Sequence, residues 1–268
     1  MRPLPGRLVL LGHPVSHSLS PRFQNAALRA AAIPLVYETL DVAPDALRGV
    51  LATLRAENAS GNVTIPHKEA FAACCTRLSP LAERCAAVNT FWHESGALVG
   101  DNTDVGGVDA IARALLGGER DSARVALIGA GGSAAAVLTA AERWGGARVR
   151  LYNRTMDRAR TLGGRFGEMV SVAESLEHAL DGATLVVNAT SIGLRDDAHP
   201  VPIDRLPPGA AVFDLVYRTG ETSWVRAARA AGHRAADGEG MLVEQGALAF
   251  ERWFGIEPDR DAMWRALR

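Results

Sequence analysis

The sequence has no long apolar run and almost no net charge, and each absence removes a class of protein. No segment approaches the roughly 18 consecutive apolar residues of a membrane-spanning helix, so we expect no membrane partner. A formal net charge of −1 over 268 residues offers no basic surface for nucleic acid. We therefore expect a partner of another kind, a small-molecule substrate, and no nucleic acid.

Cysteine is also scarce, occurring only at Cys74, Cys75 and Cys85. An odd number of cysteines without metal-ligand spacing is typical of reduced thiols. The N-terminal residues contain no apolar core of a signal peptide, and no histidine–carboxylate cluster indicates a metal. These observations predict a cytoplasmic protein with no bound metal, and they leave both a monomer and a homodimer open.

What is present is an ordinary globular composition, with 48% hydrophobic and 22% charged residues. The length suits one large or two modest domains. Expected strands include residues 7–11, 35–42, 125–128, 149–152, 185–189 and 211–216, and expected helices include 20–32, 45–56, 133–143, 157–166, 172–180 and 241–255. This alternation predicts an α/β fold in both halves, with parallel-type sheets covered by helices on both faces.

The segment Val125–Ala136 is the strongest local signal for ligand binding. Its four apolar residues predict a buried strand, and Gly129, Gly131 and Gly132 predict a tight turn into a helix of small residues. Such a turn collects free backbone N–H groups and the positive end of a helix dipole at one point. It predicts the phosphate site of a dinucleotide, with an ordinary tight turn as the alternative.

The end of the next expected strand indicates which dinucleotide is bound. Folds that bind NAD often place an acidic residue there, on the ribose hydroxyls. This chain instead has Asn153, Arg154 and Thr155, and Arg158 follows one helical turn later. Two guanidinium groups at that corner suit the 2′-phosphate of NADP, so the sequence favours NADP over NAD.

Polar residues of the N-terminal half are candidates for proton transfer. An enzyme that moves a hydride from a carbinol needs a group to take the hydroxyl proton. Lys68 and Asp104 each follow an expected strand, with Asn62, Thr64 and Asn89 in the same polar set. Spacing does not show that these residues meet in space, so a surface location of Lys68 stays open at this point.

Several motifs together resemble the shikimate dehydrogenase family along nearly the whole chain. In family order they are Gly12–Pro21, Asn62–Lys68, Ala87–Thr90, Gly100–Asp104, Gly129–Gly132, Asn153–Thr155, Asn188–Ser191, Asp214–Tyr217, Asp237–Gly238 and Met241–Gln245. The resemblance implies NADP-dependent interconversion of 3-dehydroshikimate and shikimate, a step toward chorismate and the aromatic amino acids. With a linker near Asp104, it implies a substrate domain of residues 1–104 plus 239–268 and a Rossmann-type NADP domain of residues 105–238.

The resemblance also implies a role for individual residues. Lys68 is the implied acid/base group, paired with Asp104. Implied substrate contacts are Ser18, Ser20 and Tyr217 for the carboxylate, and Thr64, Lys68, Asn89, Asp104 and Gln245 for the ring hydroxyls. Implied cofactor contacts are Gly129, Ala130, Gly131, Gly132, Ser133, Asn153, Arg154, Thr155, Arg158, Thr190, Ser191, Leu215 and Gly238. The hydroxyl and amide set fits a small polyol acid, because each ring hydroxyl needs a partner once it leaves water.

Some positions depart from the family's pattern. Gln24 stands where histidine is common, Ala135 where a basic residue is common, and Thr219 where proline is common. Glu244 is an uncommon neighbour of Gln245. We expect these differences to bear on affinity and loop detail, more than on the type of reaction.

Three alternatives are weighed against this interpretation. One is a quinate/shikimate dehydrogenase that uses NAD or both cofactors, against which Arg154 argues. Another is a non-catalytic NADP-sensing or substrate-binding module, which loss of Lys68 or Asp104 would have indicated. The third is a folate-linked dehydrogenase, whose pterin would favour an aromatic-lined pocket over the hydroxyl-rich set found here.

Overall fold

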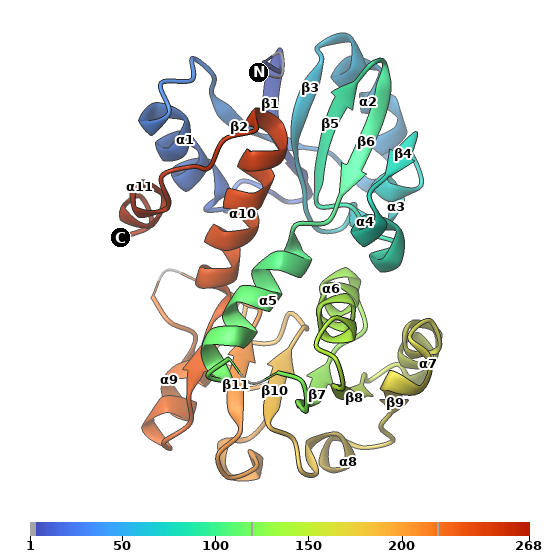
Figure 1. Ribbon diagram of the computed structural model, residues 1–268, viewed down its shortest axis with the longest axis vertical. Coiled ribbons are helices and arrows are strands. Elements are labelled where there is room, and N and C mark those ends of the chain that lie inside the picture. The colour runs from blue at the N-terminus through green and yellow to red at the C-terminus, as the bar shows by residue number, and fades with distance from the viewer. Residues whose placement is uncertain (1–3, 119, 219) are drawn as a thin grey trace. The chain divides into compact units, whose positions relative to one another are not determined.

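The computed structural model describes residues 4–118, 120–218 and 220–268, so the departure noted at Thr219 lies outside the described residues. The chain divides into two compact units, one of Met1–Asp104 with Leu242–Arg268 and one of Val105–Met241. Each unit has its own six-stranded sheet (Figure 1). Helices α5 and α10 continue across the two unit boundaries, and the second boundary falls inside α10, after the residues 238–239 expected from the sequence.

The sheet of the first unit is mixed, not parallel throughout. Its strands are β1 (Arg7–Gly12), β2 (Tyr37–Asp41), β3 (Ala59–Val63), β4 (Arg77–Leu78), β5 (Thr90–Glu94) and β6 (Ala97–Asp101), in the order β2-β1-β3-β5-β6-β4. Strand β1 pairs in parallel with β2 and β3, whereas β5 is antiparallel to both β3 and β6. Ser95 and Gly96, both with positive φ, form the two-residue turn that reverses the chain between β5 and β6.

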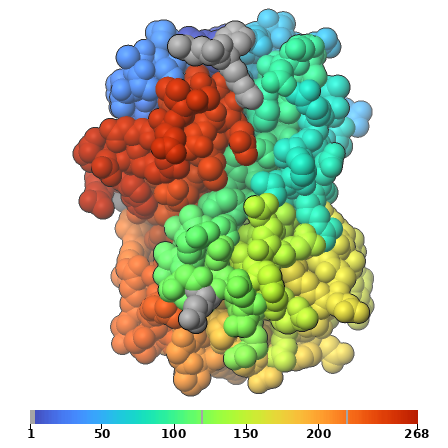
Figure 2. Space-filling view, viewed as in Figure 1, coloured from blue at the N-terminus to red at the C-terminus, as the bar shows by residue number. Residues whose placement is uncertain are grey.

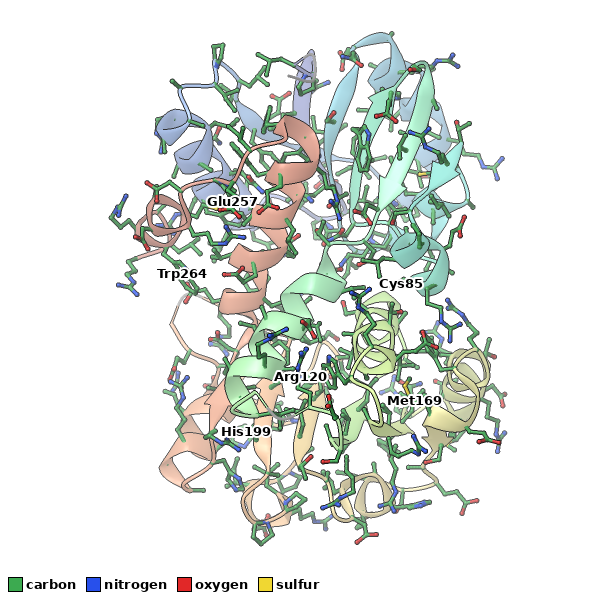
Figure 3. All side chains as sticks on the ribbon, in the orientation of Figure 1. Cys85, Arg120, Met169, His199, Glu257 and Trp264 are labelled. Atoms are coloured by element: carbon green, nitrogen blue, oxygen red, sulfur yellow. The ribbon has the colours of Figure 1, made fainter. Side chains whose placement is uncertain are left out.

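Helices pack on this sheet from the intervening segments. They are α1 (Ser20–Ala30), α2 (Leu47–Ala56, after the 3-10 turn Pro44–Ala46), α3 (Lys68–Ala72), α4 (Pro80–Cys85), α10 (Gly238–Phe254) and α11 (Arg260–Arg265). Val9 and Leu11 of β1 pack with Leu47 and Leu54 of α2 in one buried cluster. Cys85, labelled in Figure 3, is a buried cysteine at the end of α4.

The C-terminal segment returns to the first unit and is held there by side-chain hydrogen bonds. Arg252 Nε donates to Asp101 Oδ2 at 2.7 Å, and Trp253 Nε1 donates to the carbonyl oxygen of Phe91 at 3.2 Å. Helix α11 packs beside α1. In Figure 2 the C-terminal residues, in red, accordingly lie against the N-terminal ones, in blue.

The second unit contains a doubly wound parallel sheet. Its strands are β7 (Arg124–Ile128), β8 (Arg148–Tyr152), β9 (Val170–Val172), β10 (Leu185–Asn188), β11 (Ala211–Asp214) and β12 (Ala235–Ala236), in the order β12-β11-β10-β7-β8-β9. Its helices are α5 (Asp104–Leu115), α6 (Gly132–Glu142), α7 (Met156–Gly164), α8 (Leu176–Leu180) and α9 (Ser223–Ala230), with 3-10 turns at Gly167–Met169 and Ile203–Arg205. The strand order reverses between β7 and β10, and the carboxyl ends of strands at such a reversal are where open α/β sheets bind ligands.

The helix expected over residues 172–180 is wrong at its start. Residues Val170–Val172 form strand β9, which pairs with β8. Helix α8 begins only after Ser175, whose side chain accepts a hydrogen bond from the His178 N–H as an N-cap. The short strands β4, β9 and β12 depend on partners distant in sequence, so local periodicity does not reveal them. Within the described residues, no helix is both long enough and apolar enough to cross a bilayer.

We expect Arg252→Ala to lower the free energy of unfolding by about 1–3 kcal/mol. The substitution leaves the carboxylate of Asp101, which is 2% exposed, without its cationic partner. Arg265→Ala is the matched control, because Arg265 makes only an exposed 3.7 Å ion pair with Asp259, worth less than about 0.5 kcal/mol. Urea unfolding of both variants measures the difference, and equal losses would contradict this account of how α10 is held.

Candidate functional site

Lys68 and Asp104 form a buried ion pair in the first unit. Lys68 is the first residue of α3 and Asp104 the first of α5. Lys68 Nζ lies 2.6 Å from Asp104 Oδ2, with side chains 16% and 6% exposed. Lys68 is also the only lysine of the chain. The surface location left open by the sequence is therefore wrong for this residue.

Asn89 connects this pair to a buried polar cluster. Its Nδ2 donates to Asp104 Oδ1 at 2.7 Å, while its Oδ1 accepts from the backbone N–H of Thr103 at 2.8 Å. A backbone N–H is always a donor, so this contact settles which way the Asn89 amide faces. Both groups that contact the carboxylate oxygens of Asp104 therefore donate, and the N-terminus of α5 adds its positive dipole end.

A directional chain of hydrogen bonds lies behind Asn89. Tyr37 Oη donates to Asn62 Oδ1 at 2.8 Å, Asn62 Nδ2 donates to Thr90 Oγ1 at 3.0 Å, and Thr90 Oγ1 donates to Asn89 Oδ1 at 3.0 Å. Asn62 Nδ2 also donates to the carbonyl oxygen of Asn89 at 3.0 Å, which fixes the orientation of the Asn62 amide. Hydrogen bonds aligned in this way polarise one another, and they point toward Asp104.

Gln245 joins the same cluster from α10. Its Oε1 accepts from Asn89 Nδ2 at 3.2 Å, and its Nε2 donates to the carbonyl oxygen of Leu242 at 2.8 Å. Gln24, at one of the departures from the family pattern, donates to the carbonyl oxygen of Gly246 at 2.9 Å. It thus holds α10 beside α1 immediately next to Gln245. Glu244 forms an ion pair with Arg260 at 3.4 Å.

Ser18 and Thr64 lie in loops of the first unit, and Ser20 begins α1 two residues after Ser18. Ser18 Oγ accepts from the Ser20 N–H at 3.2 Å. Ser20 followed by Pro21 has the sequence of an N-cap, yet Ser20 is the first residue of α1 and the N-cap position is Leu19. Thr64 N–H donates to the carbonyl oxygen of Leu11 at 2.8 Å. Among the described residues, these three hydroxyls stand outside the cluster around Asn89.

The loop that carries Ser18 is anchored at its start by Asp41. His13 Nδ1 lies 2.6 Å from Asp41 Oδ1, and the Val15 N–H donates to Asp41 Oδ2 at 3.3 Å. The hydrogen bond from His13 lowers the pKa of the exposed Asp41 carboxyl. His13 therefore orders this loop.

The glycine-rich turn of the second unit connects β7 to α6 at the switch point of the sheet. Gly129 has φ of +113°, and a Cβ there would lie 2.7 Å from the carbonyl oxygen of Ala189. A Cβ on Gly131 would meet nothing within 4 Å, and this residue caps α6 without a side-chain hydrogen bond. The turn thus leaves open space before the backbone N–H groups of Gly132 and Ser133, as the pyrophosphate of a dinucleotide requires.

Arg154 and Arg158 follow β8, the strand beside β7. Both side chains are exposed, and neither forms an ion pair with another described residue. The adjacent turn is held by Asn153 Nδ2, which donates to the carbonyl oxygen of Thr155 at 2.8 Å. Ala135 is 3% exposed within α6, so it offers no side-chain contact to a phosphate. The residues present fit NADP, with two uncommitted guanidinium groups at the ribose corner.

The remaining cofactor candidates follow β10 and β11. Thr190 and Ser191 come after β10, and Leu215 comes after β11, with its N–H donating to the carbonyl oxygen of Asn188 at 2.9 Å. Gly238 N–H donates to the carbonyl oxygen of Val216 at 2.9 Å. Ala130 lies within the glycine turn. Tyr217, a candidate for the substrate carboxylate, belongs to this second unit and is half-buried.

These features define a class of protein: a dinucleotide-binding α/β protein with a separate unit that carries a buried Lys–Asp pair. Matches to family models narrow this class to one family. They match as "Shikimate dehydrogenase substrate binding domain" over residues 10–91, "Shikimate / quinate 5-dehydrogenase" over residues 110–194, and "Shikimate 5'-dehydrogenase C-terminal domain" over residues 238–268. The chain belongs to the shikimate dehydrogenase family.

Individual relatives agree with this assignment. The chain is 46% identical to the NADP(+) shikimate dehydrogenase of Rubrobacter xylanophilus, over 96% of this chain and 94% of that one. Among solved structures, shikimate dehydrogenase of Aquifex aeolicus matches with a TM-score of 0.91 and 34% identity, covering 98% and 97% of the two chains. The Thermus thermophilus enzyme in complex with NADP(H) and shikimate matches with a TM-score of 0.87 and 40% identity, covering 98% of each chain.

Sequence reasoning missed the parts played by Thr90, Thr103 and Tyr37. The two threonines lie inside quoted motifs, yet nothing local indicates that their hydroxyls face Asn89. Tyr37 reaches Asn62 from another strand, so only the pairing of the sheet brings them together. Among the described residues, no group of three or more histidine, cysteine or acidic side chains is placed to hold a metal ion.

Asp214, at the end of β11, has an unusual carboxyl group. Burial raises its pKa from the ordinary value of 3.8 to about 6, although hydrogen bonds from Val216, Asn188 and Thr222 act in the opposite direction. The folded protein therefore binds a proton between about pH 4 and pH 6 that the unfolded chain has released. Stability falls as the pH rises through this window, and the full cost is present at neutral pH.

We therefore expect Asp214→Asn to raise the melting temperature at pH 8. Asparagine keeps the shape, can accept from Asn188 and Val216 and donate to Thr222, and carries no buried charge. The gain should be about 1–3 kcal/mol, or several degrees, and should shrink toward zero at pH 4. Melting temperatures from pH 4 to pH 8 measure it, and a difference that is independent of pH would contradict the assignment.

Proposed function

We propose that this chain catalyses the reversible, NADP-dependent reduction of 3-dehydroshikimate to shikimate in chorismate and aromatic amino acid biosynthesis. The observation that carries the proposal is the buried cluster of Lys68, Asp104, Asn89 and Gln245. It supplies one proton-transfer group surrounded by amide and carboxylate partners for hydroxyls. The first unit, with residues 1–104 and the C-terminal return, is the substrate domain, and the second unit is the NADP domain.

Lys68 Nζ is the proton-transfer atom. NADPH, when bound, supplies the hydride that reduces the substrate's carbonyl carbon. In the reductive direction, the ammonium of Lys68 gives a proton to the carbonyl oxygen, which becomes the new hydroxyl. In the oxidative direction, the neutral amine takes the proton of that hydroxyl. Asp104 holds Nζ in place throughout, because its Oδ2 lies 2.6 Å away and its other oxygen is occupied by Asn89.

The other substrate residues orient the ring. Asn89, Asp104 and Gln245 offer donors and acceptors to the ring hydroxyls, together with Thr64 from the loop after β3. Ser18 and Ser20 are proposed to hold the substrate carboxylate through their hydroxyls, and Tyr217 contributes to the same role. A ring hydroxyl that leaves water without a partner costs on the order of 1–3 kcal/mol, so this set selects a polyol acid.

NADP is selected over NAD at the end of β8. Arg154 and Arg158 are proposed to contact the 2′-phosphate, while Gly129 to Ser133 receive the pyrophosphate. Planar guanidinium groups bind phosphate in a bidentate manner, and the exposed pair has no competing acidic partner among the described residues. Asn153, Thr155, Thr190, Ser191, Leu215 and Gly238 complete the proposed cofactor contacts.

We propose that the enzyme acts in the cytoplasm, where Cys74, Cys75 and Cys85 stay reduced. Its partners are proposed to be the substrate and NADP, and it is proposed to act as a monomer or a homodimer.

A spectrophotometric panel tests the activity directly. Shikimate and quinate are each offered with NADP⁺ and with NAD⁺, and reduced cofactor is followed at 340 nm, where the nicotinamide product absorbs. We expect the highest kcat/KM for shikimate with NADP⁺, because of the two arginines at the ribose corner. A higher value for quinate with NAD⁺ would establish the alternative quinate/shikimate dehydrogenase. No reduction of NADP⁺ by shikimate would overturn the proposal.

Replacement of the proton-transfer group tests the mechanism. We expect Lys68→Ala to lower kcat on the order of 10²–10⁴-fold and to leave NADP⁺ binding unchanged, because Lys68 belongs to the substrate unit. Lys68→Arg keeps a positive charge beside Asp104 but cannot release its proton at neutral pH. It should therefore be as inactive as Lys68→Ala.

Steady-state rates and calorimetric titration with NADP⁺ measure both effects. Near-normal turnover of Lys68→Ala would remove Lys68 from the mechanism. Near-normal turnover of Lys68→Arg alone would reduce its role to that of a fixed charge.

A further inference from the structure

The buried carboxylate of Asp214 has no part in the mechanism above, yet it joins three segments of the second unit. It accepts hydrogen bonds from Asn188 Nδ2 at 2.8 Å, from the Val216 N–H at 3.1 Å and from Thr222 Oγ1 at 2.9 Å. Asn188 ends β10, Val216 belongs to the loop after β11, and Thr222 is the N-cap of α9. The Asp214 side chain therefore connects the end of β10, the loop after β11 and the start of α9.

Asn188, which is held by Asp214, in turn binds Thr190. Asn188 Oδ1 accepts from the Thr190 N–H at 3.0 Å and from Thr190 Oγ1 at 2.7 Å. Since the backbone N–H is always a donor, Asn188 Oδ1 faces Thr190 and Nδ2 faces Asp214. The same Nδ2 donates to the carbonyl oxygen of Ile192 at 3.2 Å, and the Ile192 N–H donates to Thr190 Oγ1 at 3.1 Å. The turn at residues 190–192 is thus held from inside by one amide.

The loop after β11 is held from two sides. The Val216 N–H is bound by Asp214, and the carbonyl oxygen of Val216 accepts from the Gly238 N–H at 2.9 Å. A Cβ on Gly238 would lie 2.4 Å from the carbonyl oxygen of Leu215, so this approach requires glycine. The path of residues 215–217 therefore depends on the Asp214 carboxylate and on Gly238 together.

Both loops lie at the switch point of the sheet. Asn188 is paired with Asp214 on one side and with Ile128, the residue before Gly129, on the other. A Cβ on Gly129 would lie 2.7 Å from the carbonyl oxygen of Ala189, so the loop after β10 contacts the glycine turn directly. We propose that Asp214 is a positioning residue for the dinucleotide: acting through Asn188 and Val216, it holds these two loops in the conformation that binds NADP. The identity of the ligand rests on the proposed function.

A buried carboxylate at position 214 costs free energy that an apolar side chain would not, so packing alone does not explain it. Burial disfavours the charged form, and the nearby Asp237 raises the pKa of Asp214 further. An apolar residue would avoid that cost but would leave the Asn188 amide, the Val216 N–H and the Thr222 hydroxyl without an acceptor. Groups whose ionisation is perturbed in this way concentrate at functional sites.

The test compares NADP⁺ binding by Asp214→Ala, Asn188→Ala and Asp214→Asn, with calorimetric titration at a temperature where each is folded. We expect Asp214→Ala and Asn188→Ala to weaken NADP⁺ binding about tenfold or more. Asp214→Asn, which keeps the hydrogen-bond geometry, should stay within about threefold of the wild type. If Asp214 only added stability, the variants would differ in melting temperature, and the Kd for NADP⁺ would not rise in the two alanine variants.

Asp109→Ala is the matched control within the same unit. Asp109 of α5 accepts from Trp144 Nε1 at 2.7 Å and pairs with Arg120, which is labelled in Figure 3. It is thus a carboxylate of the same unit whose partners, Arg113, Arg120 and Trp144, lie outside the two loops that follow β10 and β11. Its removal should leave the Kd for NADP⁺ unchanged.

Wild-type affinity in folded Asp214→Ala, or an equal loss in Asp214→Asn, would overturn the proposal. If Asp214→Ala does not fold, Asn188→Ala decides in its place.

Amide hydrogen exchange without ligand separates this inference from the proposed function. Asn188→Ala and Asp214→Ala should speed exchange in residues 189–193, whereas Asp214→Asn and Asp109→Ala should not. If wild-type protein fails to bind NADP⁺, the proposed function has failed, and the exchange data still decide whether Asp214 holds the loops. Unchanged exchange at residues 189–193 in both alanine variants would overturn the positioning role.

Discussion

Asp104 ends the first unit and begins helix α5, and its buried carboxylate is the group on which the rest of the candidate active site depends. Its two oxygens are occupied by Lys68 and Asn89, which come from segments on either side of α4. An isolated ion of this kind would be strongly disfavoured away from water. Here, two donors and the positive end of a helix compensate for the lost hydration. The position of Lys68, the proposed proton-transfer group, is thus a consequence of the hydrogen bonds that the carboxylate accepts.

The two units satisfy their buried polar groups in the same manner. In each, an asparagine at a strand end is oriented by a backbone N–H, Asn89 by Thr103 and Asn188 by Thr190. The amide nitrogen then faces a buried aspartate. An asparagine can do this because it offers an acceptor and a donor at fixed separation, whereas a second carboxylate would repel the first. In both units, a main-chain N–H therefore determines which way the asparagine amide faces.

Features that depend on neighbouring residues could be predicted from the sequence. The glycine turn at Gly129, the arginines after β8 and the alternation of strands and helices are of this kind, because strand, turn and helix are contiguous. Lys68 and Asp104 could be named as candidates, but their contact could not be derived, since 36 residues separate them. The family resemblance, which rests on many motifs in order, supplied what local chemistry did not.

The errors have equally specific causes. Ser20 has the sequence of an N-cap, yet α1 begins one residue earlier than that role requires, and Leu19 occupies the cap. The helix expected over residues 172–180 is wrong at Val172, which ends strand β9: a three-residue strand carries no period, and its pairing with β8 sets its conformation. The hydrogen bonds of Tyr37 and Asp214 could not be predicted, because sheet pairing and loop closure bring their partners together from distant parts of the chain.

The single lysine has a practical consequence for the chemistry of the whole molecule. Apart from histidine, every other cationic side chain is an arginine, so Lys68 is the only side-chain amine. Reagents that acylate amines, usually indiscriminate on a protein surface, have here only two amine targets, the chain terminus and the proposed proton-transfer atom. Ordinary amine labelling would thus act as an active-site titration, in which protection by a bound ligand reports occupancy of the substrate unit at one atom.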